Sequence, residues 1–314
     1  VMQFKTALYS LVVGTFVLPT KQLFNNYLLQ TCDASKLRNL LRNELQRDYK
    51  YVPYSKAKQI IHTKINNIDL YGDNEEPQNI EHVFPQFLFK DDSRKKEMKA
   101  DLHNLYLCNT KLNTCRQNFK YVNHHHAIEQ SNSDKNTYIL DQKGAKITNY
   151  QEVFKKQGYI MSVNRKQKTF IPSTFTRGKI ARTLTYFAVK YDYLNKLHDV
   201  ININDLVLWN FIDPVDTEEY LKNMLTMKYQ NNINPFIIYP ELVPFTFADI
   251  LDHSKYNNDL KRTKPMHHTI DHVDTLNYLL NENTKLELDN EEIMREFSKL
   301  EKRILRLNSK LQEK

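Results

Sequence analysis

The sequence predicts an α+β fold in which helices and short antiparallel strands are mixed along the chain and a long helix forms the C-terminal end. Segments with apolar residues at helical spacing alternate with short apolar runs of the strand type. The chain has 314 residues, of which 40% are hydrophobic, enough to bury a large core. Only five residues are Gly, and all are isolated, so no glycine-rich phosphate loop can be built. This argues against Rossmann dehydrogenases, P-loop NTPases and protein kinases.

Apolar periodicity places the main elements. Leu37, Leu41 and Leu45 form one stripe at helical spacing, and Ile180, Leu184 and Phe187 form another. On this basis we expect helices over 34–49, 55–66, 109–119, 177–195, 206–211 and 217–230. Short strands are expected between 80 and 107, and again at 138–140 and 159–161.

The first twenty residues have the pattern of a secretory signal peptide, although the cleavage site is unclear. A single lysine, Lys5, precedes an apolar run over 7–18, which is too short to cross a bilayer unaided. The alternative is an ordinary buried first helix. Because no second apolar run qualifies as a membrane span, we expect a secreted, lumenal or periplasmic protein.

The segment 276–314 has a heptad pattern. Apolar residues recur in steps of three and four, and Asn283 and Asn290 occupy two core positions of the repeat. After a linker over 256–275, this segment is predicted to form a long helix that assembles homo-oligomers as a coiled coil. The alternative is an amphipathic helix folded back on its own domain.

Positive charge is concentrated in two stretches. Residues 155–190 hold nine Lys and Arg and no acid, and residues 94–120 hold seven Lys and Arg and two acids. Such an excess favours a polyanionic partner such as nucleic acid. For a single stretch, a solvated basic face would be the simpler interpretation.

The residues that indicate chemistry begin at Glu81-His82. Neighbouring residues on a strand point to opposite faces, so one side chain can hold a cation while the other reaches a substrate. A second short strand is expected at Asp101–Leu105, and a helix carrying Asn113 follows it. This strand, loop, strand and helix order would deliver the Asn113 oxygen close to Glu81.

These segments resemble the endonuclease I family, non-specific nucleases of the ββα-metal (His-Me finger) superfamily. Four segments carry the resemblance in the family's order. They are Glu81-His82-Val83-Phe84-Pro85-Gln86; Asp101-Leu102-His103-Asn104-Leu105 with Asn113, Arg116 and Asn118; Phe170-Ile171-Pro172 with Arg177-Gly178-Lys179-Ile180-Ala181-Arg182 and Lys190-Tyr191; and Trp209, Asp213-Pro214-Val215, Glu218, Asn223 with Gln230 to Phe236. The nuclease-like domain would occupy 21–255.

The resemblance implies a role for each matching residue. Glu81 and Asn113 correspond to the ligands of one ion, Mg²⁺ or else Ca²⁺ or Mn²⁺, and both supply the hard oxygen donors that such ions prefer. His82 corresponds to the general base, held by a backbone carbonyl of the second strand. Arg116 corresponds to a catalytic residue that could reach the phosphate.

The implied activity is metal-dependent, largely sequence-non-specific hydrolysis of DNA, with RNA as a further substrate and 5′-phosphate ends as products. Five basic residues would hold the nucleic-acid backbone: Arg177, Lys179, Arg182, Lys166 and Lys168. The alternative is a non-catalytic nucleic-acid-binding or scaffold protein that keeps the fold. The last segment departs from the family pattern, having lost one Gly and one Arg, and this departure concerns substrate handling.

Overall fold

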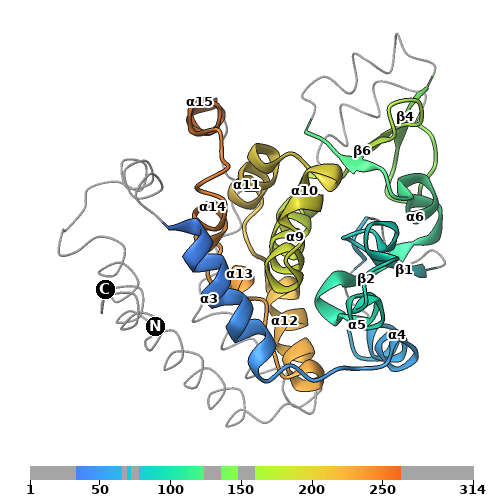
Figure 1. Cartoon of the computed structure of the whole chain (residues 1–314). Helices are drawn as coiled ribbons and strands as arrows, with labels where there is room; N and C mark the ends of the chain where they lie inside the picture. Colours follow the sequence, from blue (N-terminus) through green and yellow to red (C-terminus); the bar gives the residue numbers. More distant parts are fainter. Residues whose placement is uncertain (1–32, 66–68, 72–77, 124–135, 148–159, 263–314) are drawn as a thin grey trace.

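Helix α9 (Arg177–Tyr191) runs through the middle of the structure, and the other elements pack around it (Figure 1). The computed structural model describes residues 33–65, 69–71, 78–123, 136–147 and 160–262. Every residue of α9 after Arg177 is buried. The expected signal peptide over 1–20 and the heptad segment over 276–314 lie outside the described residues, as does the linker after residue 262.

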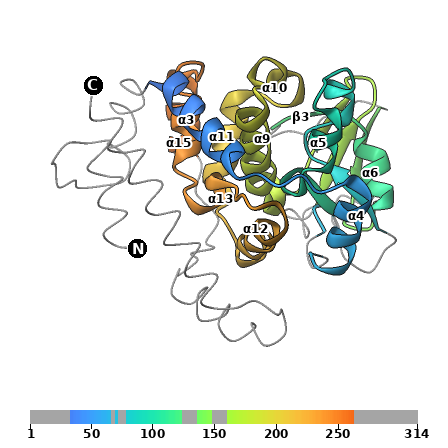
Figure 2. The ribbon, with the colours of Figure 1, turned by 60° about the horizontal axis from the view of Figure 1, so that its bottom comes forward.

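On one side of α9 lies a group of helices (Figures 1 and 2). They are α3 (Ala34–Arg47), α11 (Ile203–Ile212), α12 (Thr217–Gln230), α13 (Pro235–Ile238), α14 (Leu242–Thr246) and α15 (His253–Arg262), whereas α10 (Leu194–Val200) packs against α9 and also contacts a strand of the second sheet described below. The side chain of Asp33 caps α3 and that of Asp216 caps α12, each by accepting a backbone N–H of the first turn. Each helix expected from the periodicity is present, but those expected over 34–49, 55–66 and 109–119 end two or three residues earlier, at Arg47, Thr63 and Arg116.

On the other side of α9 lies a two-stranded antiparallel sheet followed by a helix. Strand β1 (Gln78–His82) pairs with β2 (Leu105–Asn109), with His82 opposite Leu105, and α6 (Thr110–Arg116) follows directly. Helix α4 (Tyr54–Thr63) packs against β2 and against α5 (Lys95–Ala100), which lies in the connection between the strands. The predicted strand, loop, strand and helix order is present.

Two details of this unit differ from the expectation. The second strand begins at Leu105 and not at Asp101, because residues Leu102–Asn104 form a single 3₁₀ turn that Asp101 caps. Helix α5 was not predicted, since six residues are too few to show a helical period. A further 3₁₀ turn, Gln86–Phe89, follows β1.

A second sheet has the order β3-β6-β5-β4. Its strands are β3 (Lys120–Tyr121), β4 (Thr137–Leu140), β5 (Met161–Asn164) and β6 (Thr169–Ile171), and a 3₁₀ turn over Thr174–Thr176 leads into α9. The β4–β5 and β5–β6 pairs are antiparallel as expected, whereas β3 and β6 are parallel. The mixed α+β class is confirmed.

The helix expected over 177–195 ends earlier. Asp192 adopts the left-handed conformation with φ 61°, and its N–H bonds to the carbonyl of Ala188, so the chain turns into the separate helix α10. Cys108 and Cys115 are free thiols, so they do not form a bridge with each other. Among the described helices, none combines the length and the apolar character that crossing a bilayer requires.

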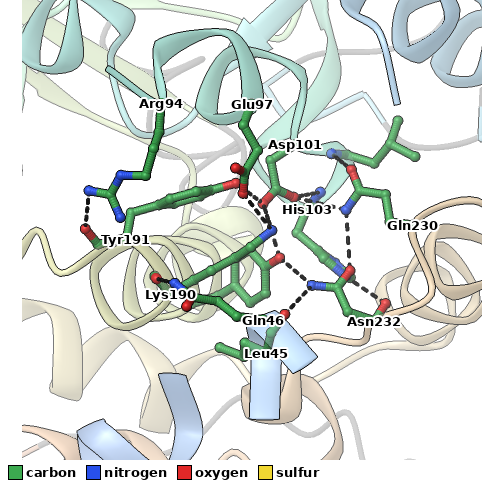
Figure 3. Close-up of polar contacts among 12 residues, drawn as sticks. Leu45, Gln46, Arg94, Glu97, Asp101, His103, Lys190, Tyr191, Gln230 and Asn232 are labelled. Carbon is green, nitrogen blue, oxygen red and sulfur yellow. Dashed lines mark hydrogen bonds and ion pairs between the residues drawn. The ribbon is translucent and has the colours of Figure 1, made fainter. Parts of the chain in front are cut away.

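The carboxylate of Asp101 links the two sides of the molecule (Figure 3). Asp101 has no solvent exposure and lies between α5 and β2. Its Oδ2 atom accepts hydrogen bonds from the Lys190 ammonium at 2.8 Å and from the phenols of Tyr186 and Tyr191, all on α9. Its Oδ1 atom accepts from the Gln230 amide at the end of α12. One side chain thus joins the ββα unit to two helices of the other side.

The charge of Asp101 is balanced locally. Burial alone would raise the pKa of the Asp101 carboxyl, but the Lys190 ammonium, His103 and the hydrogen bonds hold it well below its usual range. A carboxyl with a depressed folded-state pKa stabilises the protein above its unfolded pKa of about 3.9. That contribution is lost as the pH falls below this value.

We expect Asp101→Ala to reduce the free energy of unfolding by about 3–5 kcal/mol, because it leaves the buried Lys190 ammonium without a counter-ion. The matched control is Asp249→Ala, which removes a half-exposed partner of Arg38 and should cost less than about 1 kcal/mol. Urea denaturation at pH 7 measures both. Similar losses in the two variants would show that the structure does not depend on Asp101.

Candidate functional site

His82 is the last residue of β1, and its imidazole is held from two sides. The Nε2 atom lies 2.9 Å from the carbonyl oxygen of Lys99, and the Nδ1 atom lies 3.0 Å from the amide nitrogen of Gln86. A carbonyl only accepts hydrogen bonds, so Nε2 carries the proton and Nδ1 presents its lone pair. The holding carbonyl belongs to α5 and not, as expected, to the second strand.

The environment keeps this imidazole neutral. Burial, together with the nearby charges of Lys99 and Arg116, lowers the pKa of His82 to about 4, although the hydrogen bond to the Lys99 carbonyl acts in the other direction. A neutral imidazole can accept a proton at its unprotonated Nδ1 atom once the Gln86 amide no longer bonds to it. The arrangement therefore suits a general base.

The loop after β1 is clamped by Asn104. Its side-chain oxygen accepts the N–H of Phe84 at 2.7 Å, its amide donates to the Phe84 carbonyl, and its backbone carbonyl accepts the N–H of Val83. The Phe84 ring stacks on Phe187 of α9 at 4.4 Å between centroids. These contacts explain why the first and second sequence segments occur together: one residue of the second fixes the turn that carries Gln86 back to His82.

Glu81 lies on the opposite face of β1, as the strand alternation predicts. Its Oε1 atom accepts the Tyr71 phenol at 3.1 Å and lies 3.1 Å from Nη1 of Arg116. Tyr71 in turn bonds to the phenol of Tyr121. Burial raises the pKa of the Glu81 carboxyl, while Arg116 and Tyr71 act in the opposite direction. The carboxylate is thus enclosed by donors on the side facing the second sheet.

Asn113 lies beside the same strand. Its amide nitrogen is 3.3 Å from the carbonyl oxygen of Ile80, the residue before Glu81, and its Oδ1 atom accepts no hydrogen bond from the part of the chain that the structure describes. An amide oxygen is the kind of hard donor that a divalent cation accepts as a ligand, with waters filling the rest of its shell. No cluster of three His, Cys, Asp or Glu side chains that could hold a metal ion occurs among the described residues.

Arg116 is placed differently from the expectation of a phosphate contact. Its guanidinium is 1% exposed, stacks on Tyr121, and donates to the carbonyls of Val83 and Gln117. The Glu81 carboxylate also contacts the Arg116 guanidinium, so the guanidinium faces protein groups and not solvent. We therefore assign Arg116 to positioning Glu81 and the end of β1.

The expected basic helix is largely interior. Arg182 is fully buried and its Nε atom donates to Glu219 at 2.8 Å, while Lys179 is buried against Asp216. These cations hold α9 to α12 and do not form a surface for nucleic acid. Arg177 is half-buried, with its guanidinium over the Trp209 ring, whereas Lys166 and Lys168 are exposed in the turn between β5 and β6.

Gly178 explains why α9 can begin so close to α11. Its N–H donates to the Asp213 carboxylate at 2.7 Å, and an added Cβ would lie 1.9 Å from the Asp213 carbonyl oxygen. A larger residue cannot be accommodated there without moving one of the two helices.

The last sequence segment also supports the framework. The side-chain amide of Asn223 donates to the carbonyl of Asn234 and accepts the N–H of Asn234, and the side-chain oxygen Oε1 of Gln230 accepts the N–H of Leu102 at 2.6 Å. These side chains are buried. The departures of this segment from the family pattern therefore fall in the packing of α12 and not in a substrate surface.

Several side chains around His82 and Glu81 were not predicted from the sequence. Gln86 was part of a quoted segment without a role, and the carbonyl of Lys99 could not be foreseen because α5 was missed. Tyr54 lies beside His82, with 5.7 Å between ring centroids. The number of cations between residues 94 and 120 was the only sequence indication for Lys99.

Comparison with known proteins finds similarity to a nuclease family and to two ribonucleases. A family model described as Endonuclease I matches residues 1–241. An extracellular ribonuclease of Bacillus subtilis (strain 168) is 27% identical over 189 residues, 55% of this chain and 55% of that protein. An extracellular ribonuclease of Bacillus amyloliquefaciens is 35% identical over 86 residues, 22% of this chain and 29% of that protein. The chain thus spans about half the length of the first relative and less of the second.

The geometry predicts the tautomer of His82. At pH 7 we expect a neutral ring with the proton on Nε2, because the Lys99 carbonyl accepts from that atom. Nitrogen-15 NMR of histidine-labelled protein distinguishes the two neutral tautomers and the charged ring. A proton on Nδ1, or a charged ring at pH 7, would contradict the arrangement. The variant Gln86→Ala should shift the Nδ1 resonance and leave the tautomer unchanged.

Proposed function

Because the chain belongs to the endonuclease I family, we propose that it is a metal-dependent endonuclease that uses His82 as its general base. The observation that supports this most directly is the neutral imidazole of His82, held at Nε2 with the Nδ1 lone pair turned to the exposed Gln86 side chain. The family makes the protein a hydrolase acting on nucleic acid. The roles below are the finer part of the proposal.

The proposed reaction is the hydrolysis of a phosphodiester bond. The Nδ1 atom of His82 takes a proton from water as the water oxygen bonds to phosphorus, and the bond between phosphorus and the 3′-oxygen breaks. The leaving oxygen is protonated from solvent, so the products carry a 5′-phosphate and a 3′-hydroxyl. The exposed amide of Gln86 moves aside to admit the water to Nδ1.

Glu81 and Asn113 are proposed to hold one divalent cation, Mg²⁺ or else Ca²⁺ or Mn²⁺. Such an ion offsets the negative charge that develops on the phosphate oxygens. Arg116 keeps the Glu81 carboxylate oriented from the buried side. Tyr71 supports the same carboxylate through its hydroxyl.

The proposed substrates are RNA and DNA. Both Bacillus relatives carry the name extracellular ribonuclease, which supports RNA as a substrate and supports action outside the cell. None of the contacts described around His82 would read a particular base, so low sequence preference is expected. Exposed cations such as Lys166 and Lys168 would bind the backbone without regard to sequence.

We expect His82→Ala to lower the rate of cleavage of RNA and plasmid DNA by about 10²- to 10⁴-fold, the usual contribution of a general base. The matched control is His198→Ala, which removes an exposed imidazole on α10 and should leave cleavage unchanged. Initial rates on a quenched fluorescent oligonucleotide measure both. Retention of more than about a tenth of the activity in His82→Ala would reject the assignment.

Removal of divalent cations with EDTA should abolish cleavage, and Mg²⁺ should restore it. Glu81→Gln and Asn113→Ala should each require a higher Mg²⁺ concentration for half-maximal rate, because each removes an oxygen ligand. The control is Thr114→Ala, an exposed change on the same helix as Asn113. Cleavage that persists in EDTA, or Mg²⁺ profiles equal to that of the control, would contradict the site.

A further inference from the structure

One aromatic ring and two ammonium groups lie together beside His82. Tyr54 begins α4, Lys58 follows it one turn later on the same helix, and Lys99 belongs to α5. The Nζ atom of Lys99 lies 4.5 Å from the centroid of the Tyr54 ring, and that of Lys58 lies 5.4 Å from it. The same ring lies 5.7 Å from the imidazole of His82. The two positive charges therefore gather next to the proposed general base.

These lysines differ from the buried cations of α9. Lys179 and Lys190 are interior and each is paired with an acid. Among the described residues, no acid forms an ion pair with Lys58 or Lys99, and the Lys58 side chain is exposed. Two like charges on one ring repel each other, and only the attraction between each ammonium and the ring offsets this repulsion. An anion that bridged them would be bound favourably.

The Tyr54 ring is held in place by apolar packing. Tyr54 is half-buried and packs against the apolar cluster formed by α4, β2 and their neighbours. The ammonium groups of Lys58 and Lys99 lie over the Tyr54 ring, where a nucleobase would have to stack. The site therefore favours an anion over a stacked nucleobase. In a nucleic-acid strand, the anions next to the phosphate under attack are the neighbouring phosphates of the backbone.

We propose that Tyr54, Lys58 and Lys99 form a subsite for a backbone phosphate that neighbours the phosphate attacked at His82. The lysines bind the phosphate, and Tyr54 positions them. This inference rests on the proposed nuclease function, since it takes His82 as the centre of the reaction. The proposed subsite thus lies where α4 and α5 meet, and not on the basic helix α9 that the sequence indicated.

Binding is tested in the full-length chain carrying His82→Ala, so that the strand is not cut. A fluorescein-labelled single-stranded oligonucleotide is titrated in Mg²⁺ at several salt concentrations, with anisotropy as the readout. Adding Lys58→Ala should weaken binding roughly threefold to tenfold and reduce the slope of log K against log salt by about 0.7, the value for one lost phosphate contact on a single strand. Adding Lys56→Ala instead of Lys58→Ala should change neither the binding constant nor the salt slope. Lys56 is an exposed cation of the same helix that bonds to Gln59.

The role of the ring is tested by two substitutions at Tyr54. Tyr54→Phe keeps the ring and should retain the binding constant and its salt slope. Tyr54→Leu removes the ring and should reduce the slope as Lys58→Ala does, because the ammonium groups lose their common partner. Circular dichroism and urea denaturation of each variant show whether the fold is kept.

A salt slope for Lys58→Ala equal to that for Lys56→Ala would overturn the subsite. Equal salt slopes for Tyr54→Phe and Tyr54→Leu, with both variants folded, would also overturn the subsite. The proposed function has a separate test, because cleavage by the single variant His82→Ala at the wild-type rate would reject the base. In that case the titrations are repeated with a phosphorothioate oligonucleotide, which keeps the backbone charge and resists cleavage, and the salt slopes still show whether the lysines contact phosphate.

Discussion

The structure depends on the burial of one carboxylate. Asp101 closes the connection between the two strands of the ββα unit, and its oxygens collect donors from α9 and α12. An interior carboxylate is tolerated only when charge and hydrogen bonds compensate its desolvation, and here Lys190 and two phenols do so. The helices and the ββα unit are thus fixed to each other by a polar contact, and the loss of one member leaves a buried partner without its charge or hydrogen bond.

The helices and the faces of β1 were predictable because each depends on residues that are close together in the sequence. Apolar spacing located α3, α9 and α12, and adjacent Glu and His residues on an apolar strand indicated the two faces of β1. The placement of Glu81 and His82 on different faces follows from the geometry of any strand. The end of α9 was missed because Asp192 takes the left-handed conformation at the helix end, a position that Gly usually marks in a sequence.

The distribution of charge was less predictable. Nine cations without an acid between 155 and 190 suggested an exposed basic surface, but their counter-ions come from distant segments. Arg182 meets Glu219, and Lys190 meets Asp101, across separations that no local pattern reveals. Arg116 likewise looked like a phosphate ligand and is found under Glu81. Net charge in sequence does not distinguish a cation that faces solvent from one that neutralises a buried acid.

The support of His82 by a backbone carbonyl has a consequence for how the protein can vary. A carbonyl is present whatever side chain occupies position 99, so the orientation of the imidazole does not constrain the identity of that residue. Position 99 can therefore carry different side chains without changing how the imidazole is held. The main chain of this residue holds His82 and its side chain lies in the proposed phosphate subsite, so a substitution there would alter substrate binding and leave the orientation of the ring unchanged.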